Sequence, residues 1–169
     1  MGLEEYDFSQ SNASEQYNTL VLLDHEFGKQ KLPVKPKFYI LGGTALLFHG
    51  IKAVVTIDID TANRLSKEIK EVVEPFISDN ASEVATLAKN YEKRLIPYKP
   101  EVFKNIKVYI LSLEDIAITK LGAARHKDIE DLVKTPLLEM CNKQKLSDII
   151  SDEFDVETAN KLMQQLLVL

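Results

Sequence analysis

The sequence contains no tryptophan, and its aromatic residues amount to only 8% of the chain. This scarcity argues against a large platform of aromatic side chains on which single-stranded nucleic acid could stack. Basic residues are also in the minority, with 21 Lys and Arg against 26 Asp and Glu and a formal net charge of −5. The charge balance therefore argues against a protein that binds DNA phosphates electrostatically over its whole surface.

Cysteine is nearly absent, and long apolar runs are absent. The single cysteine, Cys141, has no partner for an internal disulfide and lies in an apolar stretch, where we expect a buried thiol in a reducing, intracellular setting. The first 16 residues are acidic and polar, unlike a signal peptide, and no apolar run reaches the ~20 residues that span a bilayer. These features predict a cytoplasmic protein without a membrane partner.

With 169 residues, of which 45% are hydrophobic and 28% charged, the chain has the composition of one globular domain. The first half has short apolar runs separated by glycine, proline and charged residues. The expected elements are a helix over 16–27 capped by Ser14 and ended by Gly28, a connector over 29–37, strands over 38–41 and 53–59, and helices over 44–49 and 62–76.

The second half changes from strands to helices. Two further strands, over 94–98 and 106–111, are expected to form an antiparallel pair, and helices follow over 113–124, 127–141 and 156–167, with a kink or restart at Pro136. We therefore expect an α+β fold, a small mixed sheet flanked by helices with a helical C-terminal third. Residues 1–112 would form the α/β core and residues 113–169 a helical region packed on it, together one compact unit.

Asp58 and Asp60 are the first candidate functional residues. One residue separates them, so on a strand both carboxylates would project from the same face, roughly 7 Å apart along the chain. Two carboxylates at this spacing can hold one divalent cation or bridge two, and Mg²⁺ binds proteins in this way, with water and phosphate as its other ligands. A second aspartate raises the cost of ionising both without metal.

Gly42, Gly43 and Thr44 lie where the strand over 38–41 meets the next helix. Glycines there allow a tight turn and a close approach of the backbone to a ligand. The free N–H groups at a helix start favour an anion such as phosphate, and Thr44 would either cap the helix or donate its hydroxyl to that phosphate. Together with the paired aspartates, this turn predicts a site for phosphate and metal.

Lys120 is a third candidate. It lies between Ile116 and Ala124 on the apolar stripe of its helix, so its ammonium group must emerge at the margin of the core. In one interpretation this ammonium group binds a polyphosphate, and in the other it forms an ion pair with Asp115 or Asp131. We expect Asp128 and Asp131 to be structural and to tie the next turn to this helix.

These segments resemble a known family. GGTALLFHG, TIDID and LEDIAITKLGAARHKDIEDL, in this order, look like the motifs of nucleotidyltransferase-fold proteins related to the AbiEii toxin and the DUF6036 group, part of the DNA polymerase beta superfamily. The YEKRL segment over 91–95 also resembles a recurrent stretch of that group. The resemblance covers roughly residues 38–132 and implies a nucleotidyltransferase-like fold.

The resemblance also implies an activity, the magnesium-dependent transfer of a nucleotidyl group from a nucleoside triphosphate to a hydroxyl, with two ions bound. On the matching positions, Gly42, Gly43 and Thr44 would hold phosphates, Asp58 and Asp60 would bind metal, and Lys120 would contact the triphosphate. The sequence departs from the pattern at Val54, where relatives commonly have arginine. It also lacks an obvious third carboxylate, for which Glu92 is the best candidate.

One segment is basic. Residues 89–107 hold six Lys and Arg against two Glu, a net of +4 that leaves −9 for the rest of the chain. Such a segment could present a local patch to RNA, for example the acceptor end of a transfer RNA. Alternatively, it is a solvated hairpin whose lysines protect an edge strand from aggregation.

Three functions remain open at this stage. The leading one is a nucleotidyltransferase acting on RNA or on a protein hydroxyl, including the toxin of a toxin–antitoxin pair with its cognate antitoxin as partner. The second is a catalytically inactive relative that binds a nucleotide, RNA or a partner protein. The third is an RNA-binding module built on the basic hairpin.

Overall fold

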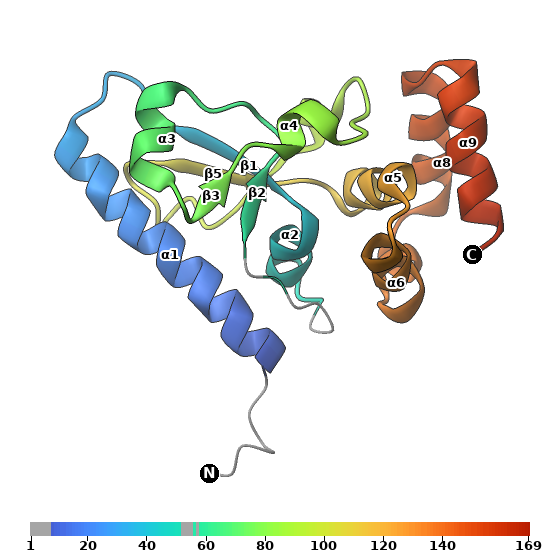
Figure 1. Cartoon of the computed structure of the whole chain (residues 1–169), viewed down its shortest axis with the longest axis horizontal. Coiled ribbons are helices and arrows are strands. Elements are labelled where there is room, and N and C mark those ends of the chain that lie inside the picture. Colours follow the sequence, from blue (N-terminus) through green and yellow to red (C-terminus); the bar gives the residue numbers. More distant parts are fainter. Residues whose placement is uncertain (1–7, 52–55, 57) are drawn as a thin grey trace, which may run out of the picture.

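The computed structural model describes residues 8–51, 56 and 58–169, and the side chains from Ala13 onward within these ranges. The elements are α1 (Phe8–Gln30), β1 (Lys37–Leu41), α2 (Gly42–Phe48), β2 (Ile59–Thr61), α3 (Lys67–Val73), β3 (Ile77–Ser78), α4 (Ala81–Val84), the 3₁₀ helix η2 (Tyr91–Arg94), β4 (Ile96–Pro97), β5 (Lys107–Ile110), α5 (Leu113–Ala123), α6 (His126–Lys134), α7 (Leu137–Met140), α8 (Lys143–Glu153) and α9 (Val156–Leu167). Figure 1 shows this order. The α+β fold with a helical C-terminal third is confirmed.

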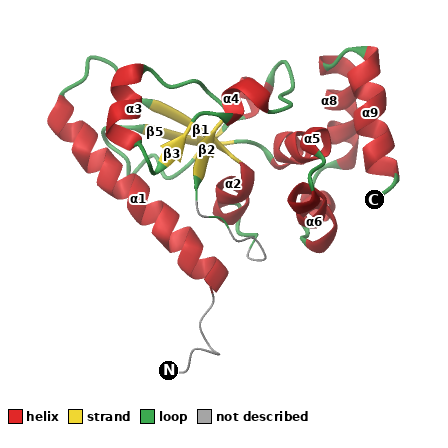
Figure 2. Cartoon of the chain, in the orientation of Figure 1, coloured by secondary structure: helices red, strands yellow, loops and turns green. Residues whose placement is uncertain are grey.

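The described strands form one mixed sheet in the order β3-β2-β1-β5-β4. The central strand β1 pairs in parallel with β5 and antiparallel with β2, and β4 pairs antiparallel with β5 as expected. On β1, Phe38 and Ile40 are buried, while Lys37 is exposed and Tyr39 is half-buried on the opposite face. Figure 2 shows the strands gathered between α1 and α4. One sheet face therefore covers the core, and the other is partly open.

The core lies under the buried face of the sheet and continues into α5. Phe27 of α1 packs on Phe38 of β1 with ring centroids 6.3 Å apart. Residues 114–121 of α5 are all buried, because this helix contacts α2 on one side and α8 and α9 on another. In Figure 1, α8 and α9 lie on the side of α5 that faces away from the sheet. The helix α5 thus joins the sheet to the C-terminal helices.

The expected boundaries of the first helix were wrong. The helix begins at Phe8, well before Ser14, and it continues past Gly28 to Gln30. Gly28 instead provides space for the Asn105 side chain, which would lie 2.7 Å from a Cβ atom at this position. The left-handed residue that follows the helix is Lys31, with φ of 51°.

The long helix over 62–76 was also wrong, since α3 begins only at Lys67, with Ser66 as its N-cap. The residues before it are held to the sheet. The side chain of Asn63 accepts a hydrogen bond from the Tyr39 N–H at 2.8 Å and donates one to the Lys37 carbonyl at 2.8 Å. These bonds replace the helical bonds that the apolar spacing suggested.

Two strand boundaries differ from expectation. In the strand expected over 53–59, residues 53–55 and 57 lie outside the described part of the chain, as does the departure at Val54, and the described strand β2 starts at Ile59. In the strand expected over 94–98, only residues 96 and 97 belong to a strand, and Arg94 is the last residue of the 3₁₀ helix η2. The helix α8 was missed entirely.

The C-terminal helices otherwise follow the sequence pattern. Ser112 caps α5 by accepting the Asp115 N–H at 3.1 Å, and the helical pattern is interrupted and restarts at Pro136. Cys141 is buried, as expected, and burial raises the pKa of its thiol to about 12. No helix among the described residues has the length and apolar character needed to cross a membrane.

Candidate functional site

A cavity of about 480 Å³ lies between the start of α2, the strand β2, the short helix α4 and the turn from α5 to α6. Four of the residues singled out from the sequence line it together: Gly42, Gly43, Asp60 and Lys120. The remaining lining residues are Leu41, Thr56, Asn80, Ala81, Val84, Ala85, Thr119, Ala123, Arg125, Lys127 and Asp128. The fold therefore brings the glycine turn, one aspartate and the lysine to one place.

Gly42 places the backbone directly against the Asp60 carboxylate. Its φ of +69° is a conformation that side-chain-bearing residues rarely adopt, and a Cβ here would lie 3.9 Å from Oδ2 of Asp60. The pairing of β1 with β2 sets this approach, because Leu41 lies opposite Asp60. A glycine is thus required by the turn, and it leaves the cavity open next to the carboxylate.

Asp60 lies in β2 and is half-buried, whereas Asp58 precedes the strand and is exposed. Burial raises the pKa of Asp60, the nearby Asp58 raises it further, and Lys127 and Arg125 act in the opposite direction. Neither carboxylate forms an ion pair with a described residue. The two acids are therefore close enough to interact, and Lys127 and Arg125 offset part of the charge of Asp60 without forming an ion pair with it.

Thr44 has a different partner from the phosphate that the resemblance implies. Its buried hydroxyl donates to the backbone carbonyl of Asp58 at 3.0 Å, and Thr56 donates to the same carbonyl at 3.2 Å. Thr44 is not among the residues that line the cavity. Its contact instead fixes the backbone of Asp58 relative to α2.

Lys120 is buried at the cavity wall and pairs with Asp131, with Nζ 2.7 Å from Oδ2 and 3.8 Å from Oδ1 of Asp128. Asp128 also accepts the backbone N–H of Arg125 at 3.2 Å and its Nε at 2.8 Å. These contacts tie α6 to α5, which confirms the structural interpretation of the two acids. The charge of Lys120 is therefore largely balanced before any ligand binds.

Arg125 and Lys127 add two exposed cationic side chains to the same cavity. Sequence spacing gave no reason to connect them with Asp60. The structure does so, because the charges of both oppose the raised pKa of Asp60. The consecutive basic residues directly after α5 were the signal that could have identified them.

A model of the family described as "Nucleotidyltransferase of unknown function (DUF6036)" matches residues 18–168. The chain belongs to this family. The resemblance to DUF6036 is thus confirmed, while the resemblance to the AbiEii toxin stays a prediction. Comparison with curated proteins and with solved structures gave no significant match.

The third carboxylate suggested by the sequence, Glu92, does not lie where it was expected in this DUF6036 chain. Among the described carboxylates, the cavity lining holds only Asp128 besides Asp60, and Asp128 already pairs with Lys120 and Arg125. Glu92 is exposed in η2 and does not line the cavity. Its charge acts on the tyrosines of the open sheet face, where burial first and Glu92 second raise the pKa of Tyr91 to about 12 and also raise that of Tyr39. Among the described residues, no group of three His, Cys, Asp or Glu could hold a metal ion.

The YEKRL segment of this DUF6036 chain has a structural role through Arg94. Its Nε and Nη2 donate to the two oxygens of Asp115 at 2.8 and 2.9 Å, and Nη1 and Nη2 donate to Glu153 at 2.6 and 3.1 Å. Glu153 also accepts the backbone N–H of Asn90 at 2.6 Å. The arginine therefore joins η2 to α5 and α8 in a buried network.

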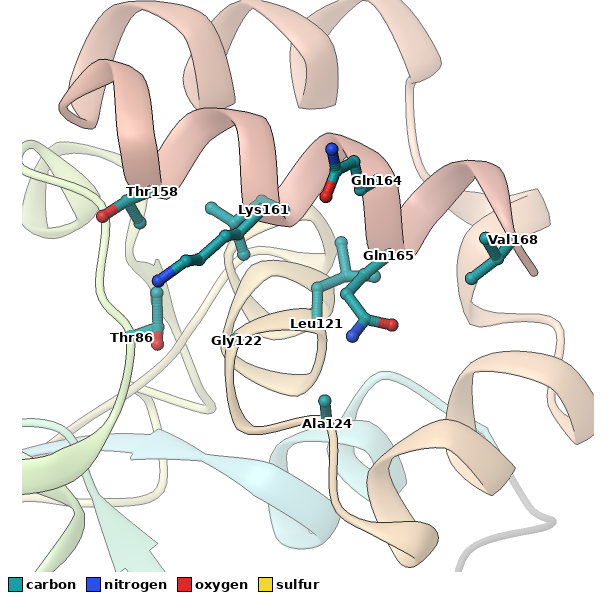
Figure 3. A pocket seen from close by; sticks show the side chains of 10 residues that line it. Thr86, Leu121, Gly122, Ala124, Thr158, Lys161, Gln164, Gln165 and Val168 are labelled. Atoms are coloured by element: carbon teal, nitrogen blue, oxygen red, sulfur yellow. The ribbon is translucent and has the colours of Figure 1, made fainter.

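A second cavity, of about 380 Å³, lies on the other side of the end of α5, between this helix and α9. Figure 3 shows Lys161 and Gln165 of α9 on one side and Thr86 and Gly122 on the other. Gly122 is required here, because a Cβ would lie 2.2 Å from the Thr86 hydroxyl. The lining is mostly neutral, and no carboxylate faces it.

Proposed function

We propose that the protein is a magnesium-dependent nucleotidyltransferase that transfers NMP from an NTP to a hydroxyl of RNA or of a protein. One observation carries this proposal. A half-buried aspartate that forms no ion pair with a described residue, Asp60, lies against a glycine turn in a cavity whose opposite wall carries Lys120, Arg125 and Lys127. Family membership supports the same class of reaction.

Mg²⁺ fits the donor set of Asp58 and Asp60. Both are hard oxygen donors, the second is half-buried with a raised pKa, and described residues leave both without an ion pair. Mg²⁺ prefers one or two protein carboxylates and keeps water or phosphate as its other ligands. The described residues therefore suit one ion. The other carboxylate that lines the cavity, Asp128, is paired with Lys120 and Arg125, so the described lining leaves no uncommitted carboxylate for a second ion.

The triphosphate would lie along the glycine turn. Gly42 and Gly43 let the backbone approach it, and Arg125 and Lys127 would pair with its oxygens from the facing wall. Lys120, held by Asp131, would supply a fixed charge at the back of the cavity. Thr44 would act indirectly, because it positions the backbone of Asp58.

In the transfer, the acceptor oxygen bonds to the α-phosphorus while the bond from that phosphorus to the leaving oxygen breaks. Pyrophosphate leaves, and the acceptor proton passes to water. When bound, Mg²⁺ would neutralise charge on the phosphate groups. The contribution of the chain is to position the triphosphate and to stabilise its charge, which account for most of the acceleration in phosphoryl chemistry.

A second candidate is a relative that binds a nucleotide without chemistry. Two observations favour it: Glu92 lies outside the cavity, and Lys120 is already paired. Such a protein would bind NTP through the same turn and cations. It would release no pyrophosphate.

The proposal is tested by incubating the protein with each α-labelled NTP, magnesium, and total RNA or lysate. Wild type should label an acceptor, and Asp58→Asn combined with Asp60→Asn should not. Lys143→Gln, an exposed change in α8, serves as the control and should retain labelling. Equal labelling by wild type and the aspartate variant would contradict the proposal, and NTP binding without labelling would favour the second candidate.

The role as a toxin with a cognate antitoxin follows only from the resemblance and is proposed on that basis. If it holds, induced expression of wild type should arrest growth, while Asp60→Asn expressed to the same level should not. Growth that is unaffected by the wild-type protein would contradict it.

A further inference from the structure

Five lysines lie on loops and strand ends remote from the candidate cavity: Lys31, Lys35, Lys37, Lys104 and Lys107, which we call the lysine surface. All five are exposed, and none forms an ion pair with a described residue. The chain is acidic overall, with a net charge of −5. This end of the sheet is therefore locally positive in a chain that is acidic overall.

The backbone holds these lysines together. Lys37 and Lys107 are direct partners in the parallel pairing of β1 with β5. Lys35 and Lys107 line a hollow of about 310 Å³ together with Tyr109, and Lys31 and Lys35 line a smaller one of about 120 Å³. Like charges placed directly opposite on a sheet destabilise it, so their position calls for a reason outside the fold.

Neighbouring acids do not compensate the lysine surface. Asp24 accepts the backbone N–H groups of Lys104, Asn105 and Ile106 at 3.3, 2.8 and 3.0 Å. Glu26 pairs with Lys29, which is not part of the surface. The acids that pack closest to this loop are thus engaged elsewhere.

Protection of strand edges explains only part of the lysine surface. Lys37 and Lys107 lie where β1 and β5 have no second partner strand, because β2 pairs with β1 only at residues 40 and 41 and β4 pairs with β5 only at residues 109 and 110. Lys31, Lys35 and Lys104 lie on no strand. The basic segment over 89–107 is also divided by the fold. Arg94 is committed to Asp115 and Glu153, and Lys99 lies over the rings of Tyr17 and Tyr98.

The open face of the sheet connects the lysine surface to the candidate cavity. Side chains alternate along a strand, so Lys37, Tyr39 and Leu41 share one face of β1, and Lys107 and Tyr109 share the same face of β5. The rings of Tyr39 and Tyr109 are in edge contact, with centroids 5.7 Å apart, and both are half-buried.

The path ends at the proposed catalytic aspartate. Leu41 lies opposite Asp60 in the antiparallel pairing of β1 with β2, so the side chain of Asp60 is on this face as well. From Lys37 to Leu41 the strand rises about 13 Å. This length suits fewer than about four nucleotides of an extended strand, so the rest of a bound strand would lie on the lysine surface.

We propose that the open face of the sheet binds single-stranded nucleic acid, with backbone phosphates on the lysine surface and the strand passing Tyr39 and Tyr109 toward Asp60. The strand end at Asp60 then carries the acceptor hydroxyl, and this assignment rests on the proposed function. The binding of nucleic acid does not rest on the proposed function, because the lysine surface contributes no residue to the cavity. RNA and DNA share the phosphate chemistry and are separated by the experiment.

The test is fluorescence anisotropy of a labelled 12-nucleotide oligo(U) RNA and its DNA counterpart, without NTP or magnesium. Lys37→Gln with Lys107→Gln should weaken binding of the preferred strand at least tenfold. The slope of log affinity against log salt should fall by about 1.4, since a single-stranded contact contributes roughly 0.7 per phosphate. Lys67→Gln with Lys143→Gln removes the same charge from exposed, unpaired positions and should change affinity less than twofold.

A second readout separates binding from folding. Lys37→Gln with Lys107→Gln should unfold at the same or a higher urea concentration than wild type, because it removes two like charges that face each other. Retained affinity in this variant, equal loss in the control pair, or tighter binding to phosphatidylserine vesicles than to either oligonucleotide would overturn the proposal. Tighter binding of RNA than DNA would identify the acceptor as RNA.

The two proposals fail independently. Asp60→Asn should lose nucleotidyl transfer, whereas the control pair Lys67→Gln with Lys143→Gln should retain both oligonucleotide binding and transfer. Transfer to a protein acceptor by a chain that binds neither oligonucleotide would refute the nucleic-acid surface alone. Lysine-dependent binding of an oligonucleotide by a chain that transfers no nucleotide to any acceptor would refute the proposed function alone.

Discussion

Asp60 lowers the stability of the fold when it is charged, yet the proposed function requires its charge. It is half-buried, near a second acid and without an ion pair among the described residues. Such a site costs stability when the carboxylate is charged. The proposed magnesium ion would remove that cost when it binds.

Asp60→Asn should therefore increase stability at neutral pH. Because the folded-state pKa of Asp60 is raised, the wild type loses stability as pH rises above the unfolded value of about 3.9, and the variant does not. Urea unfolding at pH 7 should show a higher midpoint for Asp60→Asn than for wild type. The gain should disappear below pH 4, and a lower midpoint at pH 7 would contradict the account.

Ala124 is a second informative residue, because it ends α5 with φ of 49°, where a Cβ is strained. Ala124→Gly should stabilise the protein by about 1 kcal/mol, the usual cost of a left-handed residue reduced by the greater freedom of glycine in the unfolded chain. Ala123→Gly, one position earlier and still helical, should destabilise by a similar amount. Shifts of the same sign in both variants would refute this.

Several single residues of the site could be predicted from the sequence, whereas contacts between distant segments could not. Gly42, Asp60 and Lys120 could be selected because their residue types and local spacing already indicate phosphate and metal chemistry. The hydroxyl bond of Thr44 and the position of Arg125 depend on segments that meet only in the fold. No local pattern specifies such contacts.

At the scale of elements, the Arg94 network holds η2, α5 and α8 together. The side chain of Asp115 is 1% exposed and that of Arg94 14%, so the pair is largely shielded from water. Arg94→Leu should destabilise the protein by about 3–5 kcal/mol, because it leaves a buried carboxylate without its partner. Lys93→Leu, next to it and exposed, should change stability by less than about 0.5 kcal/mol, and equal losses in urea unfolding would contradict the network.

The same network predicts a pH dependence. Hydrogen bonds from Arg94, and then from the Asn90 N–H, hold the pKa of Glu153 below its usual range, against the effect of burial. Its contribution to stability is present above the unfolded pKa, about 4.3, and is lost as pH falls through the folded pKa. Glu153→Gln should thus show a shallower fall of the urea midpoint below pH 4 than wild type, and parallel curves would exclude the contribution.

The sequence predicted best those elements whose ends carry local signals. The helix α9 has the expected bounds, because its apolar spacing and Asp155 cap are local signals. The helix α8 was missed although Leu146, Ile149 and Ile150 follow helical spacing, since its apolar stripe is narrow. The strands β3 and β4 have two residues each, too few for a periodic pattern.

At the scale of the whole molecule, the sheet separates two charged regions. The glycine turn follows the carboxyl end of β1, where Leu41 pairs with Asp60 of β2, and the amino end of β1 carries Lys37 of the lysine surface. The net charge of −5 is a sum over the whole chain and does not show that charged groups gather in these two regions. The low aromatic content excludes a large stacking platform, but Tyr39, Tyr91 and Tyr109 still form a small aromatic group on the open face.

The fold class follows from the order of patterns along the chain, while strand pairing required the structure. Sequence order alone does not place β5 beside β1, because almost 70 residues separate them. This pairing is what puts Lys107 beside Lys37 and Tyr109 beside Tyr39. The sequence placed Lys104 and Lys107 in a basic segment that could bind RNA, but it did not indicate that Lys37 lies beside Lys107.

Release of pyrophosphate from NTP in the presence of magnesium and total RNA tests the central claim most directly. The account predicts release by wild type and by Lys143→Gln, none by Asp60→Asn, and none when magnesium is removed with EDTA. Release at the wild-type rate by a correctly folded Asp60→Asn variant would contradict the account.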